Sequence, residues 1–156
     1  MITNKKGNLL TAFKNKEVAS IAHCINSYNK WGSGIALQLK SAYPNAHKMD
    51  CTTGICGDRR KLGKFLISEE TDGILFSIHG QHNYGAGTVQ VDYGALAEGL
   101  EGVRDYMVSN DVPSIGLPRI GAGLAGGDWT RIFEIIEKTF ANTIIDVTVF
   151  EYGKNK

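Results

Sequence analysis

The chain has 156 residues, of which 42% are hydrophobic and 21% are charged, and its formal net charge is +1. This composition is typical of a globular protein, and the length fits a single domain over residues 1–156. The near-zero charge argues against general binding to nucleic acid or to an anionic membrane. No apolar run is long enough to span a bilayer, no secretory signal is recognisable, and the three cysteines follow no disulfide-framework spacing. We therefore expect a soluble, monomeric, cytoplasmic protein.

Apolar segments flanked by polar turns predict strands. These segments are residues 1–4, 18–24, 65–68, 74–79, 112–117 and 147–152. Apolar residues at helical spacing predict a short helical turn and three longer helices. They are residues 9–13, 34–43, 93–107 and 129–140. Pro44 ends the second of these helices. Because strands and helices alternate, we expect an α/β fold whose largely parallel sheet is covered on both faces.

One stretch shows neither pattern. Residues 47–63 are basic and irregular, so we expect an exposed excursion, with Asp58–Lys61 as a solvated surface run. His47, Cys51 and Cys56 lie in this stretch, but they match no zinc-finger spacing and have no evident fourth ligand. We expect no metal and no cofactor.

Ligands of parallel α/β sheets bind beyond the carboxyl ends of the strands. Three loops should meet at that edge, namely residues 26–34, 80–90 and 118–128. The last belongs to Gly116–Trp129, a glycine-rich segment between a strand and a helix start. Glycine lets the backbone approach a ligand closely, and a helix N-terminus carries partial positive charge. The segment therefore predicts a phosphate-binding loop.

Two common phosphate-binding patterns compete for this segment. Gly121–Gly126 matches G-x-G-x-x-G, the dinucleotide-binding pattern, and Asp146 follows at a suitable distance. That fold needs two consecutive βαβ halves, whereas only one helix and one strand remain after these glycines, so the match is poor. A Walker loop is excluded because no Lys-Ser or Lys-Thr pair follows the glycines.

The loops together indicate a different family. Ala22–Pro44 (AHCINSYNKWGSGIALQLKSAYP), followed by Leu117–Trp129 (LPRIGAGLAGGDW), resembles the macrodomain family of ADP-ribose-binding modules. The resemblance covers nearly the whole chain and is closest to the subfamily of ADP-ribose 1''-phosphate phosphatases and terminal ADP-ribose glycohydrolases. It implies a three-layer α/β/α fold around a mixed, mostly parallel sheet of about six strands.

The resemblance also implies a ligand-binding surface. The first loop would wrap the distal ribose and diphosphate, with Asn26 contacting that ribose, and the second loop would bind the phosphates through backbone N–H groups. Asn8 and Leu9 would lie near the adenine, and Phe150 or Tyr152 would pack on its ring. The implied loop residues are Gly32, Ser33, Gly34, Ile35, Pro118, Ile120, Gly121, Ala122, Gly123 and Leu124.

This chain departs from the family pattern at two places. Asn8 stands where the family often has aspartate, so a neutral amide would recognise the adenine amino group more weakly. In the glycohydrolases the second loop resembles I-G-x-G-L-D, and a lysine of the middle loop forms a covalent intermediate. This chain has Ala125 after Leu124 and no lysine within residues 80–90. The second departure favours the phosphatase branch.

Three residues are candidates for the chemistry. Asp128 suits a general base or a water-orienting carboxylate, although aspartate before a helix is also a common N-cap. His23 is either a proton donor or a buried core histidine, and His82 is either a general acid or a solvated loop residue. Trp31, beside Gly32, either shields the ligand or packs in the core.

The resemblance and the departures lead us to expect a phosphatase that converts ADP-ribose 1''-phosphate to ADP-ribose and phosphate. Two alternatives stay open. One is a hydrolase that removes ADP-ribose from protein or nucleic acid, and the other is a non-catalytic module that binds ADP-ribose or a related nucleotide. No nucleophile is evident, so positioning and electrostatics would carry the catalysis.

Overall fold

A six-stranded sheet forms the middle of the molecule in the computed structural model, which describes residues 1–85, 89–123 and 125–151. The strands in spatial order are β1 (Ile2–Lys6), β6 (Asp146–Glu151), β5 (Ser114–Leu117), β2 (Ser20–Asn26), β4 (Gly73–Gln81) and β3 (Phe65–Glu70). All neighbouring pairs are parallel except β3 and β4, which form an antiparallel hairpin. The predicted mixed, mostly parallel sheet is confirmed.

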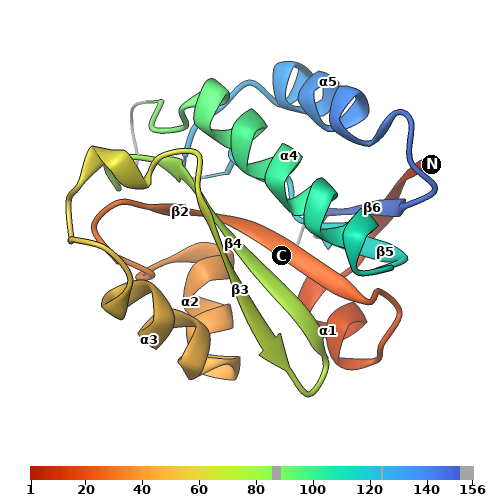
Figure 1. Ribbon diagram of the computed structural model, residues 1–156, viewed down its shortest axis with the longest axis horizontal. Coiled ribbons are helices and arrows are strands. Elements are labelled where there is room, and N and C mark those ends of the chain that lie inside the picture. Colours follow the sequence, from red (N-terminus) through yellow and green to blue (C-terminus); the bar gives the residue numbers. More distant parts are fainter. Residues whose placement is uncertain (86–88, 124, 152–156) are drawn as a thin grey trace.

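Helices cover both faces of this sheet (Figure 1). The helices on one face are α1 (Leu9–Lys14), α2 (Gly34–Ala42) and α3 (Pro44–Thr52). The helices on the other face are α4 (Tyr93–Ser109) and α5 (Trp129–Phe140). A short 3-10 turn, η1 (Arg59–Lys61), precedes β3. The three-layer α/β/α arrangement is therefore confirmed, and none of the described helices is long and apolar enough to cross a membrane.

Strand alternation builds the two halves of the core. Successive side chains of a strand point to opposite faces, so Ile21 packs with α1 and α2 while Ala22 packs with α4 and α5. Leu96 and Ile132 are fully buried on the second face. At about 25 cal/mol per Å² of apolar surface removed from water, this burial is the main favourable term for the fold. The packed core fixes the positions of the strand ends and therefore of the loops that follow them.

The stretch after α2 differs from its prediction. Residues 47–63 are not an irregular excursion, because α3 begins at Pro44 and a turn of 3-10 helix follows. Proline stops a preceding helix but is well tolerated at the first position of the next one, where its missing N–H would have no partner. Nor is the basic run wholly solvated, since the side chain of Lys61 is only 6% exposed.

Strand boundaries shift by a few residues from the predicted ones. β2 runs on to Asn26 and β4 to Gln81, so both reach further toward the loops than their apolar runs suggested. β5 begins at Ser114 because Pro113 has no N–H to offer the sheet. These changes do not alter the strand order.

Candidate functional site

The carboxyl ends of β5, β2 and β4 lie at one edge of the sheet, and the three predicted loops follow them there. β2 and β5 are parallel neighbours, with Ile21 opposite Gly116. The chain leaves β2 toward α2 on one face and leaves β5 toward α5 on the other. Such a divergence is the topological switch point at which open α/β sheets form a ligand-binding crevice.

The first loop begins with a closed hydrogen-bond pattern around Asn26. Its Oδ1 accepts the N–H groups of Tyr28 at 2.9 Å and Lys30 at 3.2 Å, and its Nδ2 donates to the Lys30 carbonyl at 2.8 Å. The Asn26 side chain therefore shapes the loop itself. One of its two Nδ2 hydrogens bonds to no described residue, so the predicted contact with a ribose stays a prediction.

The second half of this loop leaves backbone donors free. Ser33 occupies the N-cap position of α2, but its side chain makes no capping hydrogen bond. Gly34 follows with φ of 59°, and a Cβ at Gly32 would meet nothing within 4 Å. Within the described part of the chain, the N–H groups of Gly34 and Ile35 find no acceptor. Uncapped first-turn N–H groups and the helix dipole make this end of α2 suited to an anion.

The second loop presents glycine backbone in the same way. Gly121 has φ of 76°, and its carbonyl accepts the N–H of Gly127 at 2.9 Å, which folds the loop back on itself. A Cβ at Gly123 would enter open space. Neither Gly121 nor Gly123 donates its N–H to any described residue, whereas Ala122 donates to Arg119 at 3.0 Å. Two of the predicted phosphate donors are thus free and Ala122 is not.

The other predicted binding residues of the second loop are Pro118, Ile120 and Leu124. Ile120 is buried, and its N–H donates to the carbonyl of the half-buried Pro118 at 2.6 Å, so both shape the turn. Leu124 lies outside the described residues. The fixed turn at the end of β5 therefore sets the direction in which the glycines leave the sheet.

The middle loop is tied to both of its neighbours. Gln90 and Val91 donate their N–H groups to the Ala125 carbonyl at 2.7 and 3.3 Å, which joins it to the second loop. On the other side, the His82 carbonyl accepts the N–H of Ser27 at 3.1 Å, and His82 Nε2 lies 3.4 Å from the Tyr28 hydroxyl. His82 is half-buried at the carboxyl end of β4, beside the first loop.

The residues predicted to lie near the adenine have only in part the positions expected of them. Asn8 follows β1 at the loop edge, but its Oδ1 accepts the Thr11 N–H at 3.1 Å and caps α1. The side chains of Leu9 and Phe150 are buried in the core, where both would touch a Cβ placed at Gly116. The ring of Phe150 therefore packs in the core, and its packing on an adenine ring stays a prediction. Tyr152 lies outside the described residues.

Asp128 has the position expected for a residue at the end of the second loop. It is exposed, its Oδ1 accepts the Thr130 N–H at 3.0 Å, and it caps α5. Its own N–H donates to the Tyr93 hydroxyl at 2.9 Å. Its Oδ2 bonds to no described residue, so the carboxylate can cap the helix and still face a ligand.

His23 lies in the core, beneath the first loop. It is fully buried in the middle of β2, its Nε2 lies 2.8 Å from Ser77 Oγ, and its ring packs edge-on against Trp31. Burial lowers the pKa of His23 to about 3, outweighing the opposite effect of Asp50. A neutral, enclosed imidazole does not suit the predicted role of proton donor.

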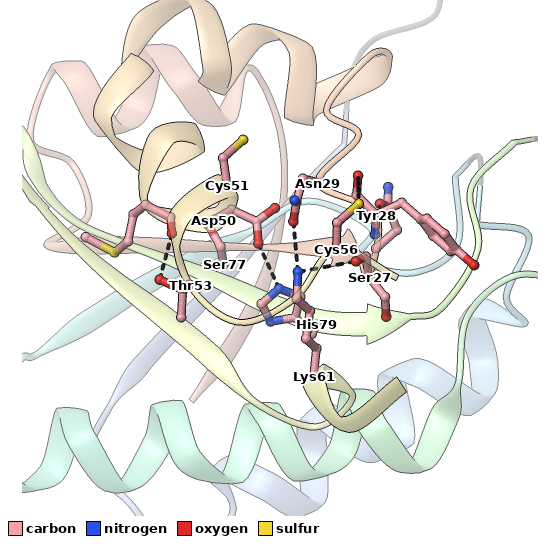
Figure 2. Close-up of polar contacts among 12 residues, drawn as sticks. Ser27, Tyr28, Asn29, Asp50, Cys51, Thr53, Cys56, Lys61, Ser77 and His79 are labelled. Carbon is pink, nitrogen blue, oxygen red and sulfur yellow. Dashed lines mark hydrogen bonds and ion pairs between the residues drawn. The ribbon is translucent and has the colours of Figure 1, made fainter. Parts of the chain in front are cut away.

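Sequence reasoning missed a buried polar cluster under the first loop (Figure 2). Asp50 is 0% exposed, and its carboxylate bonds to His79 Nε2 and Trp31 Nε1, both at 2.9 Å. Lys61 Nζ bonds to two loop oxygens close by. Trp31 is thus a core residue and not an exposed shield. A lone aspartate on a weakly amphipathic helix gave no signal, because its partners are far away in the sequence.

The described residues contain no group of three or more histidine, cysteine or acidic side chains placed to hold a metal ion. His47 and Cys51 do come together on α3, with Sγ 3.5 Å from Nε2. Cys56 instead donates its thiol to the Tyr28 carbonyl at 3.5 Å. Each of the two cysteines thus contacts a different part of the structure.

Known proteins resemble the chain over most of its length. It is 30% identical over 137 residues to a 17.5 kDa protein from the tk-vs intergenic region of Enterobacteria phage T4, covering 85% of each chain. It is 26% identical over 149 residues to the human ADP-ribose glycohydrolase OARD1, covering 96% of this chain and 90% of that one. It is also 26% identical over 175 residues to the ADP-ribose 1''-phosphate phosphatase of Candida glabrata, covering 94% and 96%. No protein-family model matches the sequence.

Solved structures show the same architecture. A macrodomain protein from Streptomyces coelicolor superposes with a TM-score of 0.67 at 28% identity, covering 98% of this chain and all of that one. The macrodomain of Thermus aquaticus DarG gives a TM-score of 0.79 at 23% identity, covering 96% and 97%. Fold and loops together define an α/β/α domain in which the loops after β2 and β5 flank a topological switch point. The chain belongs to the macrodomain family.

Proposed function

We propose that this chain binds ADP-ribose in the crevice between the first and second loops. The observation that carries the proposal is the pair of unpartnered backbone surfaces on its two sides. Gly34 and Ile35 offer N–H groups from the start of α2, and Gly121 and Gly123 offer them from the second loop. Backbone donors on both sides of a crevice, with a helix N-terminus behind one of them, suit a diphosphate.

The order of strands suggests how the ligand lies. Asn8 follows β1, the second loop follows β5, the first loop follows β2 and His82 follows β4. Neighbouring strands are about 4.8 Å apart, so the edge from β1 to β4 spans about 19 Å. This length gives room for an extended dinucleotide-like ligand. We place its adenine near Asn8, its diphosphate between the two glycine loops, and its distal ribose toward His82.

We propose further that the chain hydrolyses ADP-ribose 1''-phosphate. A water oxygen attacks the phosphorus, the bond between phosphorus and the ribose 1'' oxygen breaks, and the products are ADP-ribose and inorganic phosphate. Asp128 orients the water and accepts its proton, and His82 donates a proton to the departing oxygen. The free N–H groups of the second loop stabilise the charge on the phosphoryl oxygens, which is the larger contribution.

A second candidate is removal of ADP-ribose from a protein or nucleic acid at the same crevice. Human OARD1 is named an ADP-ribose glycohydrolase and covers nearly the whole chain. The sequence between Gly80 and Gln90 contains no lysine, and Ala125 stands after Leu124. We therefore propose attack by water, since the middle loop supplies no lysine amine.

Titration calorimetry with ADP-ribose tests the binding proposal. The wild type should bind, and Gly123→Glu should not, because its carboxylate would enter the open space of the crevice and repel the diphosphate. Ser109→Glu adds the same charge at the exposed far end of α4 and should bind like the wild type. Unchanged affinity in Gly123→Glu would refute the crevice. Binding without turnover of either substrate would favour the remaining alternative, a non-catalytic module that binds ADP-ribose.

A further inference from the structure

The segment that links α2 to β3, residues 44–63, is hydrogen-bonded to the first loop. We propose that Lys61, supported by Asp50, is a positioning residue that fixes this loop in its ligand-binding shape. The inference rests on the proposed ADP-ribose crevice. Neither side chain belongs to the free N–H surface of the loop. Lys61 contacts Ser27 and Asn29 (Figure 2), and Asp50 contacts Trp31, so both contact residues that precede Gly32.

Lys61 supplies the central contact. Its Nζ donates to the Ser27 carbonyl at 3.3 Å and to Asn29 Oδ1 at 2.9 Å, and the side chain is almost completely buried. Burying an ammonium group is costly unless oxygen acceptors replace its water. The two loop oxygens do so only when the loop lies in this shape, so the buried charge favours that shape over others.

Asn29 shows what the charge holds in place. Its φ is 59°, in the left-handed region, which asparagine adopts more readily than most residues that carry a side chain. Its side-chain oxygen binds Lys61, and its carbonyl oxygen lies 3.0 Å from His47 Nε2. Two donors from the linking segment therefore bind the same turn residue and hold it in this conformation.

Asp50 fixes the far end of the same turn. It is fully buried, and its Oδ2 accepts the Trp31 Nε1–H at 2.9 Å, while its Oδ1 lies 2.9 Å from His79 Nε2 on β4. Trp31 immediately precedes Gly32, the first of the predicted binding residues. The carboxylate thus joins the loop to α3 and to the sheet at the position where the free N–H groups begin.

Two further contacts from the linking segment complete the anchorage. The Gly57 N–H donates to the Ser27 carbonyl at 2.7 Å, and the Cys56 thiol donates to the Tyr28 carbonyl at 3.5 Å. Residues 27, 28, 29 and 31 are each bonded to the segment, and the binding residues follow directly. A loop held in its bound shape loses less conformational entropy when a ligand arrives, which raises affinity.

The test uses Lys61→Met, which keeps the length of the side chain and removes the charge. ADP-ribose affinity should fall about tenfold, because the lost bonds involve a charged donor. AMP affinity should not change, because AMP has no distal ribose or second phosphate for the first loop to hold. Lys64→Met, the same change at an exposed lysine nearby, should leave both affinities at wild-type values.

Loss of affinity for only the larger ligand is a result that general destabilisation does not give. Equal losses for ADP-ribose and AMP, or no loss for either, would overturn the proposal. If Lys61→Met does not fold, Asn29→Gly replaces it, because glycine keeps the positive φ freely and removes the oxygen that Lys61 binds. The same selective loss is expected there, and its absence counts against the proposal.

Failure of the proposed function would be visible separately, as a wild type that does not bind ADP-ribose. The positioning role would then be decided by amide hydrogen exchange. Residues 27–35 should exchange faster in Lys61→Met than in Lys64→Met, while β2 keeps its protection. Equal exchange of the loop in the two variants would refute the role of Lys61.

Discussion

The indole Nε1 of Trp31 donates a 2.9 Å hydrogen bond to Oδ2 of Asp50, and both side chains are buried. The same carboxylate also binds His79. Burial by itself would raise the pKa of Asp50, but the hydrogen bonds from His79 and Trp31, together with the nearby positive charge of Lys61, hold the pKa below its usual range. The charged form of Asp50 is therefore the one that the fold stabilises.

This relationship predicts a stability difference that depends on pH. A carboxyl with a lowered pKa stabilises the folded state above its unfolded pKa of about 3.9, and the contribution is lost as the pH falls through the folded value. Asp50→Asn should therefore be less stable than the wild type by about 1–3 kcal/mol near neutral pH. Urea unfolding should show the difference shrinking below about pH 4. A difference that stays constant there would contradict the account.

His23 also has a lowered pKa, so the same principle predicts a second pH-dependent contribution to stability. Its pKa is lowered to about 3 by burial, so between that value and about 6.5 only the unfolded state takes up its proton. The stability that a neutral His23 contributes is present above about pH 6.5 and falls by about 1.4 kcal/mol per pH unit below it. His23→Gln should show a flatter decline of unfolding free energy between about pH 6.5 and 5. Parallel declines would argue against a buried neutral imidazole.

Asp128 allows capping and catalysis to be separated. Asparagine also caps helices well, so Asp128→Asn should keep the melting temperature, whereas Asp128→Ala should lose about 1 kcal/mol of stability. Both should bind ADP-ribose normally and release phosphate at least about 100-fold more slowly, since both lack the carboxylate. Wild-type turnover in Asp128→Asn would leave this residue a helix cap only.

Two glycines of the second loop should respond differently to alanine. Gly121 has φ of 76°, and a Cβ there would lie 3.1 Å from Val91 and 3.2 Å from Ile132. Gly121→Ala should lower the unfolding free energy by about 1–2 kcal/mol. Gly123→Ala should leave stability unchanged, because a Cβ there meets nothing within 4 Å and its φ is not in the left-handed region. Thermal unfolding of the pair decides this, and equal stabilities would contradict the loop geometry.

Much of the fold followed from local pattern in the sequence. The long helix after Asp92 was recognisable from its apolar spacing and its cap, and the structure has Asp92 Oδ1 accepting the Ala95 N–H. The strand order could not be predicted from the sequence, because strand pairing depends on contacts between segments that are far apart in the chain. The positions of the loops at one sheet edge nevertheless followed from parallel strands alone.

What the sequence hid was long-range pairing of polar groups. Asp50 and His79 are 29 positions apart, and Lys61 finds its acceptors 32 and 34 positions away. No periodicity records such contacts, so the basic run around Lys61 predicts a surface position. The partners of Asn26 and the burial of Phe150 were hidden for a related reason, because a motif gives a residue type and not the contacts of its side chain.

The proposed phosphatase reaction is tested by incubating the protein with ADP-ribose 1''-phosphate and measuring inorganic phosphate and ADP-ribose together. The wild type and Ser109→Glu should give equal amounts of both products, and Gly123→Glu should give none above background. No phosphate from the wild type, or equal release by Gly123→Glu, would contradict it.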